Sequence, residues 1–127
     1  MKKIFFAVMF AVLTFANNCA AKDIWLEHWQ SENIDLYVMD DTITSGSSKT
    51  DKHFKVSTKF VRNGQLQKVV QWSFSKYITD MWRYETNTMD GSHTTVVIPR
   101  NALFEFCMNQ LGWSYRIVED HAIRHYY

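Results

Sequence analysis

The chain has 127 residues, and its 14 Lys and Arg side chains against 13 Asp and Glu give a formal net charge of +1. This balance excludes a general electrostatic attraction to nucleic acid or to an anionic membrane. A chain of this length is long enough to bury the core of one domain. The aromatic content of 16% supplies the large side chains that such a domain needs to bury enough apolar area.

Residues 1–21 have the layout of a secretory signal peptide. Two lysines precede an almost wholly apolar run from Ile4 to Ala16, and small residues at Cys19 and Ala21 suit cleavage after Ala21. The run is too short to span a bilayer, which takes about twenty residues. We therefore expect an exported protein, periplasmic or extracellular, whose residues 22–127 form a single α+β domain without a transmembrane segment.

Cys19 permits a second interpretation, the acylated cysteine of a bacterial lipoprotein. A lipid chain there would tether the mature domain to a membrane. Two asparagines precede Cys19, however, where such proteins carry a small residue. We therefore favour cleavage after Ala21.

Strands are predicted along the first half of the mature chain. Glu27 and His28 fall on a probable strand, where they point to opposite faces. Ile34 to Met39 reads as a second strand, and the polar, small residues from Asp40 to Asp51 read as a loop. The segment from His53 to Phe60 alternates strictly between apolar and polar side chains, which is typical of a strand with one buried face.

Asn63-Gly64 predicts a hairpin turn after that strand. A two-residue turn would pair apolar with polar faces, because a slip of one residue exchanges the two faces of a strand. We therefore predict a three-residue loop, Asn63 to Gln65. The resulting pairs are Phe54 with Phe74, Val56 with Trp72, and Thr58 with Val70. A second hairpin is predicted at Asp90-Gly91, where Met81 to Met89 pairs with Thr94 to Ile98.

One helix is predicted near the C-terminal end. Asn101 is a good N-cap for Ala102 to Leu111, and Gly112 suits the residue after the helix. Cys107 lies among apolar neighbours within it, so we expect a buried, inert thiol. Trp113 to Ile117 alternates and predicts a closing strand. The sum is an α+β fold: an antiparallel β-sheet of about five or six strands with the helix packed on it.

Motifs of catalysis and cofactor binding are absent from the sequence, so we expect no enzyme activity, cofactor or metal. The best candidate for a metal site is the pair His121 and His125, four residues apart and beside Glu119 and Asp120. Two imidazoles near a chain end do not make a structural site. A small metal-dependent hydrolase is accordingly the most distant of three functional hypotheses.

Charge is distributed unevenly along the chain. The stretch from Asp23 to Asp41 carries acids and no Lys or Arg, whereas the stretch from Lys49 to Lys76 carries bases and one acid. We favour a fold in which the two stretches pair across neighbouring strands. The alternative is a basic face that meets an acidic partner. It would be formed by Lys55, Lys59, Arg62 and Lys68.

Exposed aromatic side chains are the other candidates for binding, because Trp and Tyr are common anchors of protein and glycan interfaces. Trp25 and Trp29 are expected to share one face of the first strand. Together with Lys55, Lys59 and Lys68 they form the predicted binding surface for a macromolecular partner, a protein or a glycan rather than nucleic acid.

The run from Tyr37 to Ile43, followed by a loop and the strand from His53 to Val61, resembles the opening of small exported bacterial proteins similar to surface-adhesin protein E. The resemblance implies a compact antiparallel sheet with a helix and a role in binding host proteins. Our leading hypothesis is therefore a non-enzymatic, adhesin-like domain that binds a macromolecule at the cell surface or in the envelope. The alternative is a periplasmic inhibitor or accessory factor of an envelope enzyme.

Overall fold

The computed structural model describes residues 23–78, 80–88, 95–120 and 123–127. The predicted signal peptide, Cys19 and His121 lie outside these residues. Within them, no helix has the length and apolar character needed to cross a membrane.

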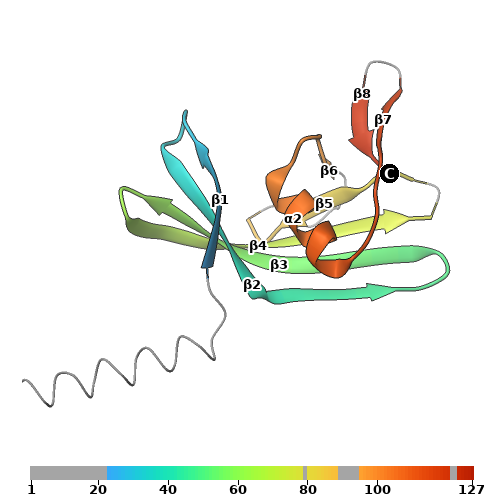
Figure 1. Ribbon diagram of the computed structural model, residues 1–127, viewed down its shortest axis with the longest axis horizontal. Coiled ribbons are helices and arrows are strands. Elements are labelled where there is room, and N and C mark those ends of the chain that lie inside the picture. The colour runs from blue at the N-terminus through green and yellow to red at the C-terminus, as the bar shows by residue number, and fades with distance from the viewer. Residues whose placement is uncertain (1–22, 79, 89–94, 121–122) are drawn as a thin grey trace, which may run out of the picture.

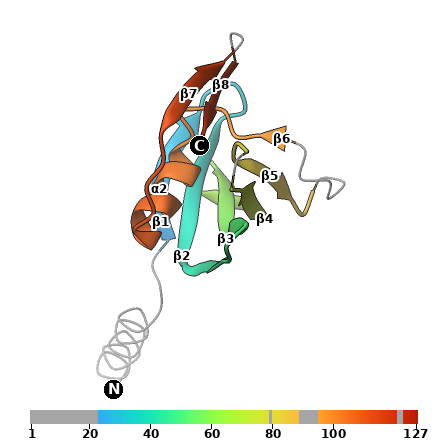
Figure 2. The same ribbon diagram turned by 90° about the vertical axis from the view of Figure 1, so that its right-hand side faces the viewer.

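The fold is α+β, as expected: a six-stranded antiparallel sheet, one helix and a second, two-stranded sheet. The strands of the main sheet lie in sequence order (Figure 1). They are β1 (Asp23–Trp29), β2 (Ile34–Ser47), β3 (Asp51–Arg62), β4 (Gln65–Tyr77), β5 (Arg83–Thr86) and β6 (Thr95–Val96). Figures 1 and 2 show helix α2 (Ala102–Leu111) on one face of this twisted sheet, and the hairpin of β7 (Ile117–Asp120) and β8 (Ile123–Tyr126) beyond it.

The central hairpin has the predicted register across the core. Phe54 pairs with Phe74, Val56 with Trp72, and Thr58 with Val70. The predicted three-residue loop is wrong, because β3 and β4 are joined by two residues, Asn63 and Gly64. Both have positive φ, 52° and 78°, as the favoured two-residue hairpin turns require.

A β-bulge reconciles that short turn with the apolar register. Phe60 pairs with Lys68, but the next residue, Val61, pairs with Leu66, so Gln67 is the extra residue. The bulge shifts the register by one position and thereby keeps the apolar side chains of both strands on the same face.

Strand β2 is longer than predicted, because most of the expected loop from Asp40 to Asp51 belongs to it or to β3. The register of β2 shifts between Met39 and Thr44. Thr42 stabilises this irregularity: its hydroxyl donates to the Met39 carbonyl at 2.6 Å and accepts from the Ser57 amide at 2.8 Å. A side chain thus replaces a ladder bond, which composition alone does not reveal.

In the C-terminal third of the chain the predicted helix is confirmed, but the strands predicted on either side of it differ from those in the structure. Asn101 caps α2 by accepting from the Phe104 amide at 2.9 Å, and Gly112 adopts the left-handed conformation after it. The strand predicted from Trp113 to Ile117 is wrong: β7 begins at Ile117 and pairs with β8, not with the main sheet. The second predicted hairpin is confirmed only as the short pair β5–β6, and its turn lies outside the described residues.

The core lies between the sheet and α2. Phe54 and Phe74 stack with ring centroids 4.7 Å apart, and Phe104 of α2 packs against both. Tyr126 of β8 is fully buried against Phe104, at 4.3 Å between ring centroids. Its carbonyl accepts from the Trp82 amide at 3.0 Å, so the end of the chain is fixed to the main sheet.

Candidate anion-binding pocket

A cavity of ≈ 580 Å³ opens where the ends of β3 and β4 meet the segment that leaves α2. Its volume is within the range of ordinary ligand sites. Three cationic side chains line it, and the lining contains neither Asp nor Glu. The lining residues are Lys52, Lys76, Ile78, Ser114, Tyr115, Arg116 and Tyr127.

Two of the cations are brought together by the β3–β4 register. Lys52 and Lys76 are directly opposite one another in the ladder, on the same face as Phe54 and Phe74 and therefore on the side of the sheet that α2 covers. Like charges in such cross-strand positions are destabilising. The arrangement therefore costs stability unless an anion lies between or beside the two ammonium groups.

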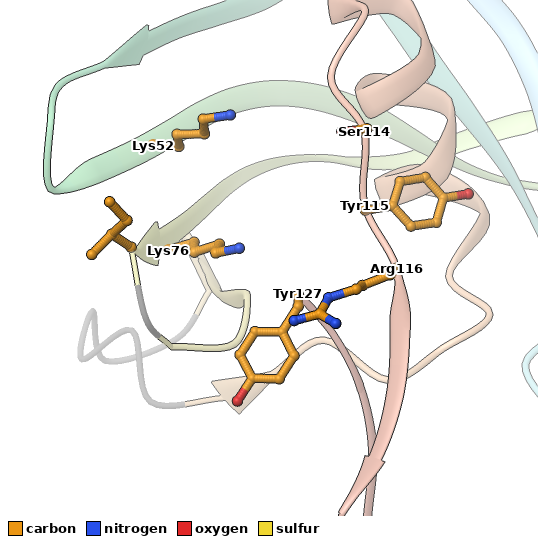
Figure 3. A pocket seen from close by; sticks show the side chains of 7 residues that line it. Lys52, Lys76, Ser114, Tyr115, Arg116 and Tyr127 are labelled. Atoms are coloured by element: carbon orange, nitrogen blue, oxygen red, sulfur yellow. The ribbon is translucent and has the colours of Figure 1, made fainter.

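The third cation comes from the opposite wall. Arg116 is held in place by two backbone hydrogen bonds with Tyr127, at 3.0 and 2.8 Å. In Figure 3 the Lys52 and Lys76 side chains extend toward this wall, and the Arg116 guanidinium lies beside the Tyr127 ring. The Tyr115 ring points away from the lysines, so the hydroxyl of that tyrosine is not directed at them.

The environment of Lys76 disfavours the charged form of its side chain. Partial burial lowers the pKa of Lys76 below its ordinary 10.5, and repulsion from Lys52 and then Arg116 lowers it further. No ion pair within residues 23–78, 80–88, 95–120 and 123–127 involves any of these three cations. Geometry and electrostatics together therefore describe a pocket that favours an anion.

Aromatic rings support the cations. The Lys52 ammonium lies 5.3 Å from the centroid of Trp113, and the Tyr127 ring has Lys76 at 5.6 Å and the Arg116 guanidinium at 5.5 Å. A ring face attracts a cation without neutralising it. The three positive charges thus stay available to a ligand.

A second cavity, of ≈ 310 Å³, adjoins the first and shares Lys52, Lys76, Ile78 and Ser114 with it. It adds Lys49, another cation, from the turn between β2 and β3. It also adds one acid, Asp51, whose carboxylate lies 2.9 Å from the His53 imidazole. Positive side chains therefore outnumber acids along both cavities.

The predicted tryptophans do not share a face. Trp25 pairs with Tyr37 on the outer face, whereas Trp29 pairs with Ile34 on the core face, because β1 has a bulge between Trp25 and Glu27. The expectation that the two share one face of the first strand is therefore wrong. Glu27 and His28 do point to opposite faces, as predicted, since their partners Leu36 and Asp35 are neighbours in β2.

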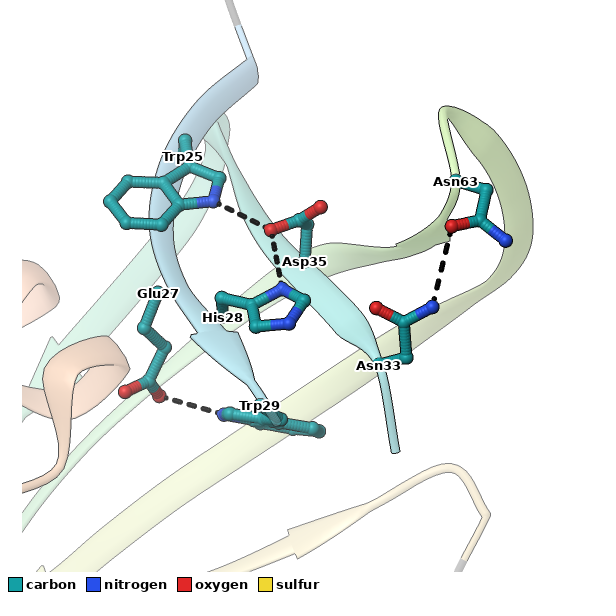
Figure 4. Close-up of polar contacts among 7 residues, drawn as sticks. All are labelled: Trp25, Glu27, His28, Trp29, Asn33, Asp35 and Asn63. Atoms are coloured by element: carbon teal, nitrogen blue, oxygen red, sulfur yellow. Dashed lines mark hydrogen bonds and ion pairs between the residues drawn. The ribbon is translucent and has the colours of Figure 1, made fainter. Parts of the chain in front are cut away.

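Each tryptophan has its own polar partner (Figure 4). Trp25 is 53% exposed, and its indole N–H donates to the Asp35 carboxylate at 3.1 Å. The Nδ1 atom of His28 is hydrogen-bonded to the same carboxylate oxygen at 3.0 Å. Trp29 packs edge-on against Phe60 at 5.1 Å and donates to the Glu27 carboxylate at 3.0 Å. Trp25 is thus exposed, whereas Trp29 serves packing.

The predicted basic face is divided between the two sides of the sheet. Lys55 and Lys59 share the outer face, whereas Lys68 pairs with Phe60 on the other face and lies over its ring at 5.2 Å. Lys59 forms an ion pair with Asp23 at 2.7 Å. That ion pair joins the acidic and the basic stretches, but it crosses β2, whereas pairing between neighbouring strands was predicted. These lysines therefore do not converge on one site.

Of the histidine pair considered for metal binding, only His125 is among the residues that the structure describes. His125 is 2% exposed on β8, and neither of its ring nitrogens has a hydrogen-bond partner. No group of three or more His, Cys, Asp or Glu side chains suited to a metal is found among the described residues. Cys107 is fully buried, as expected, and burial raises the pKa of its thiol to about 12.

The pocket cations were missed at the level of sequence. Lys52 and Lys76 follow from the correct register, since the same pairing that joins Phe54 to Phe74 places them opposite each other. Arg116 could not be found in this way, because its position depends on the backbone pairing with Tyr127. Comparison with known proteins finds no matching family model, no matching curated protein and no matching solved structure.

Proposed function

We propose that this protein is a non-enzymatic, exported binding domain that takes an anionic group of another macromolecule into the pocket of Lys52, Lys76 and Arg116. The observation that carries the proposal is the placement of two lysines opposite one another with an arginine facing them. A fold that needed only stability would gain from an acid at one of these positions. An anionic ligand supplies the missing negative charge.

Arginine and lysine contribute differently to such a site. The planar guanidinium of Arg116 presents several fixed donors to a carboxylate, phosphate or sulfate group, whereas the lysines act as compact charges. Because the walls are already in position, the ligand does not have to order them, which favours binding. The resemblance to proteins similar to surface-adhesin protein E supports the proposal of a binding role, and we propose a partner at the cell surface or in the envelope.

Titration with inorganic phosphate tests the pocket directly. Lysine and arginine side-chain NMR signals are followed at constant ionic strength, maintained with chloride. We expect saturable shifts at Lys76 and Arg116, and their loss in the double variant Lys76→Glu plus Arg116→Glu. The double variant Lys55→Glu plus Lys59→Glu is the matched control, because it changes the net charge equally on the opposite face of the sheet. Equal loss in both double variants would contradict the proposal.

Export is tested by the intact mass of the protein recovered from its native host after fractionation. A mass that begins at Lys22 in a soluble fraction supports a freely exported binding domain. A diacylglyceryl mass that begins at Cys19 in the membrane fraction would replace this with a tethered one. A cytoplasmic protein that retains Met1 would refute export.

A further inference from the structure

We infer that the ligand is an acidic oligosaccharide that carries at least two anionic groups and extends across both cavities. This inference rests on the proposed function and specifies the chemistry of its ligand. The two cavities are continuous in their lining, since Lys52, Lys76 and Ser114 contribute to each. A single inorganic anion would occupy only a small part of them.

The cations are spread along this groove. Arg116 lines only the first cavity and Lys49 only the second, while Lys52 and Lys76 line both. A ligand that satisfies both ends therefore has negative groups at intervals along its length. Repeated sulfate or carboxylate groups on a sugar chain have this pattern.

The rest of the lining favours a sugar over a peptide. Ser48 and Ser114 add small hydroxyl side chains to the lining, and Ile78, its aliphatic side chain, is 66% exposed. Most peptides are recognised through apolar pockets or by addition to an edge strand, whereas acidic peptides bind clusters of Arg, a mode that hexaglutamate tests. Here β3 is paired on both sides, because Lys52 has partners in β2 and β4.

Nucleic acid fits less well, because single strands bind by stacking bases on open aromatic faces. Cationic side chains already lie over the rings of Trp113 and Tyr127. Lys52 lies over Trp113, and Lys76 and Arg116 lie over Tyr127. Trp82, which lines the second cavity, is only 1% exposed.

Calorimetry with a set of defined probes tests the inference. The probes are inorganic phosphate, a monosaccharide and a tetrasaccharide of galacturonic acid, a heparin-derived tetrasaccharide, hexaglutamate and an oligothymidylate. We expect at least one tetrasaccharide to bind about tenfold or more tightly than the monosaccharide, the equivalent of one good charged contact. Preference for the galacturonate or for the heparin fragment tells carboxylate from sulfate.

Variants locate the binding along the groove. Lys49→Gln is expected to reduce tetrasaccharide affinity about tenfold and to leave phosphate affinity unchanged, because Lys49 lines only the second cavity. Arg116→Gln is expected to weaken both ligands. Lys68→Gln, at an exposed position outside both linings, is the control.

The possible failures are distinguishable. If phosphate binds but the tetrasaccharides bind no tighter than the monosaccharide, or if hexaglutamate or the oligothymidylate binds most tightly, the inference is wrong and the proposed function stands. If phosphate causes no saturable change at Lys76 and Arg116, the proposed function itself is wrong.

Discussion

Lys52 and Lys76 are direct cross-strand partners in the β3–β4 ladder, and both line the same cavity. The pKa of Lys76 is lowered, first by partial burial and then by repulsion from Lys52 and Arg116. The pocket therefore works against the stability of the fold that contains it.

Lys76→Glu should stabilise the protein and abolish anion binding. The new carboxylate attracts Lys52 and Arg116 where the ammonium repelled them, and a favourable cross-strand pair contributes about 0.2–1 kcal/mol. Thermal unfolding and phosphate titration measure the two effects. Lys55→Glu, whose partner in β4 is Ser73, should leave phosphate binding intact. A destabilised Lys76→Glu variant would argue against repulsion in the native pocket.

The charge of Lys76 should make stability depend on pH in the alkaline range. Its folded-state pKa is lowered, first by partial burial and then by repulsion, and the unfolded chain has neither effect. The unfolded state therefore binds more protons between the folded pKa and 10.5, so this group's contribution to stability rises with pH across that window. Below the folded-state pKa, Lys76 is charged in both the folded and the unfolded protein, and its destabilising effect is fully present.

Arg116→Gln should raise the pKa of Lys76 and narrow this window, because it removes one of the repelling charges. A carbon-13 NMR titration of the lysine side chains measures the change directly. Arg62→Gln, at the far end of β3, is the control. An unchanged Lys76 pKa in the Arg116 variant would show that the guanidinium does not act on it.

Tyr126→Phe should destabilise the protein by about 0.5–1.5 kcal/mol, the usual net contribution of a hydrogen bond, because the partners of its hydroxyl are only partly buried. The Tyr126 hydroxyl donates to Glu105 at 2.5 Å and accepts from the Asn101 amide at 2.8 Å. It thereby joins β8 to the first turn of α2. Denaturant unfolding measures the loss, and Tyr77→Phe, at a 68% exposed position, should change little.

Cys107 should resist alkylation in the folded protein. Burial raises the pKa of its thiol from 9.0 to about 12, so the reactive thiolate is scarce at pH 8. Iodoacetamide labelling followed by mass spectrometry should show modification only in denaturant. The stability that the neutral thiol contributes is complete below pH 9.0 and is lost as the pH rises toward 12. Rapid labelling of the native protein would contradict the buried placement.

Trp25→Phe should raise the pKa of Asp35. The indole hydrogen bond is the largest cause of the lowered pKa of this carboxyl, and the hydrogen bond with His28 is the next. The contribution of Asp35 to stability is present above pH 3.8 and is lost as the pH falls through its lowered folded pKa. NMR titration of the carboxyl carbon measures the shift, and Trp29→Phe, on the other face, should leave it unchanged.

The elements that follow from local pattern were predictable. Asn101 and Gly112 define α2 because capping depends on residues within one turn. The central register followed from the strict alternation of β3. The bulges were not predictable in the same way. One extra residue near Leu26 places Trp25 and Trp29 on opposite faces, and neither composition nor alternation predicts it.

The predicted binding lysines illustrate the same limit. Lys55 and Lys59 were correctly placed on one face by alternation within β3, but alternation cannot tell which charges on neighbouring strands meet. The pocket needs the position of the segment from Trp113 to Tyr127 as well. Its first part, Trp113 to Ile117, was expected to form a closing strand, and instead Ser114, Tyr115 and Arg116 contribute to the opposite wall.

The two walls of the pocket come from distant parts of the chain, which has a consequence for biosynthesis. A nascent chain that has already formed β3 and β4 still lacks the wall that carries Arg116 and Tyr127. Non-local closures of this kind are slow steps of folding. The pocket is therefore complete only when the segment that carries Arg116 and Tyr127 has folded onto the sheet, and a protease cut after α2 should remove the proposed anion binding while sparing most of the strands.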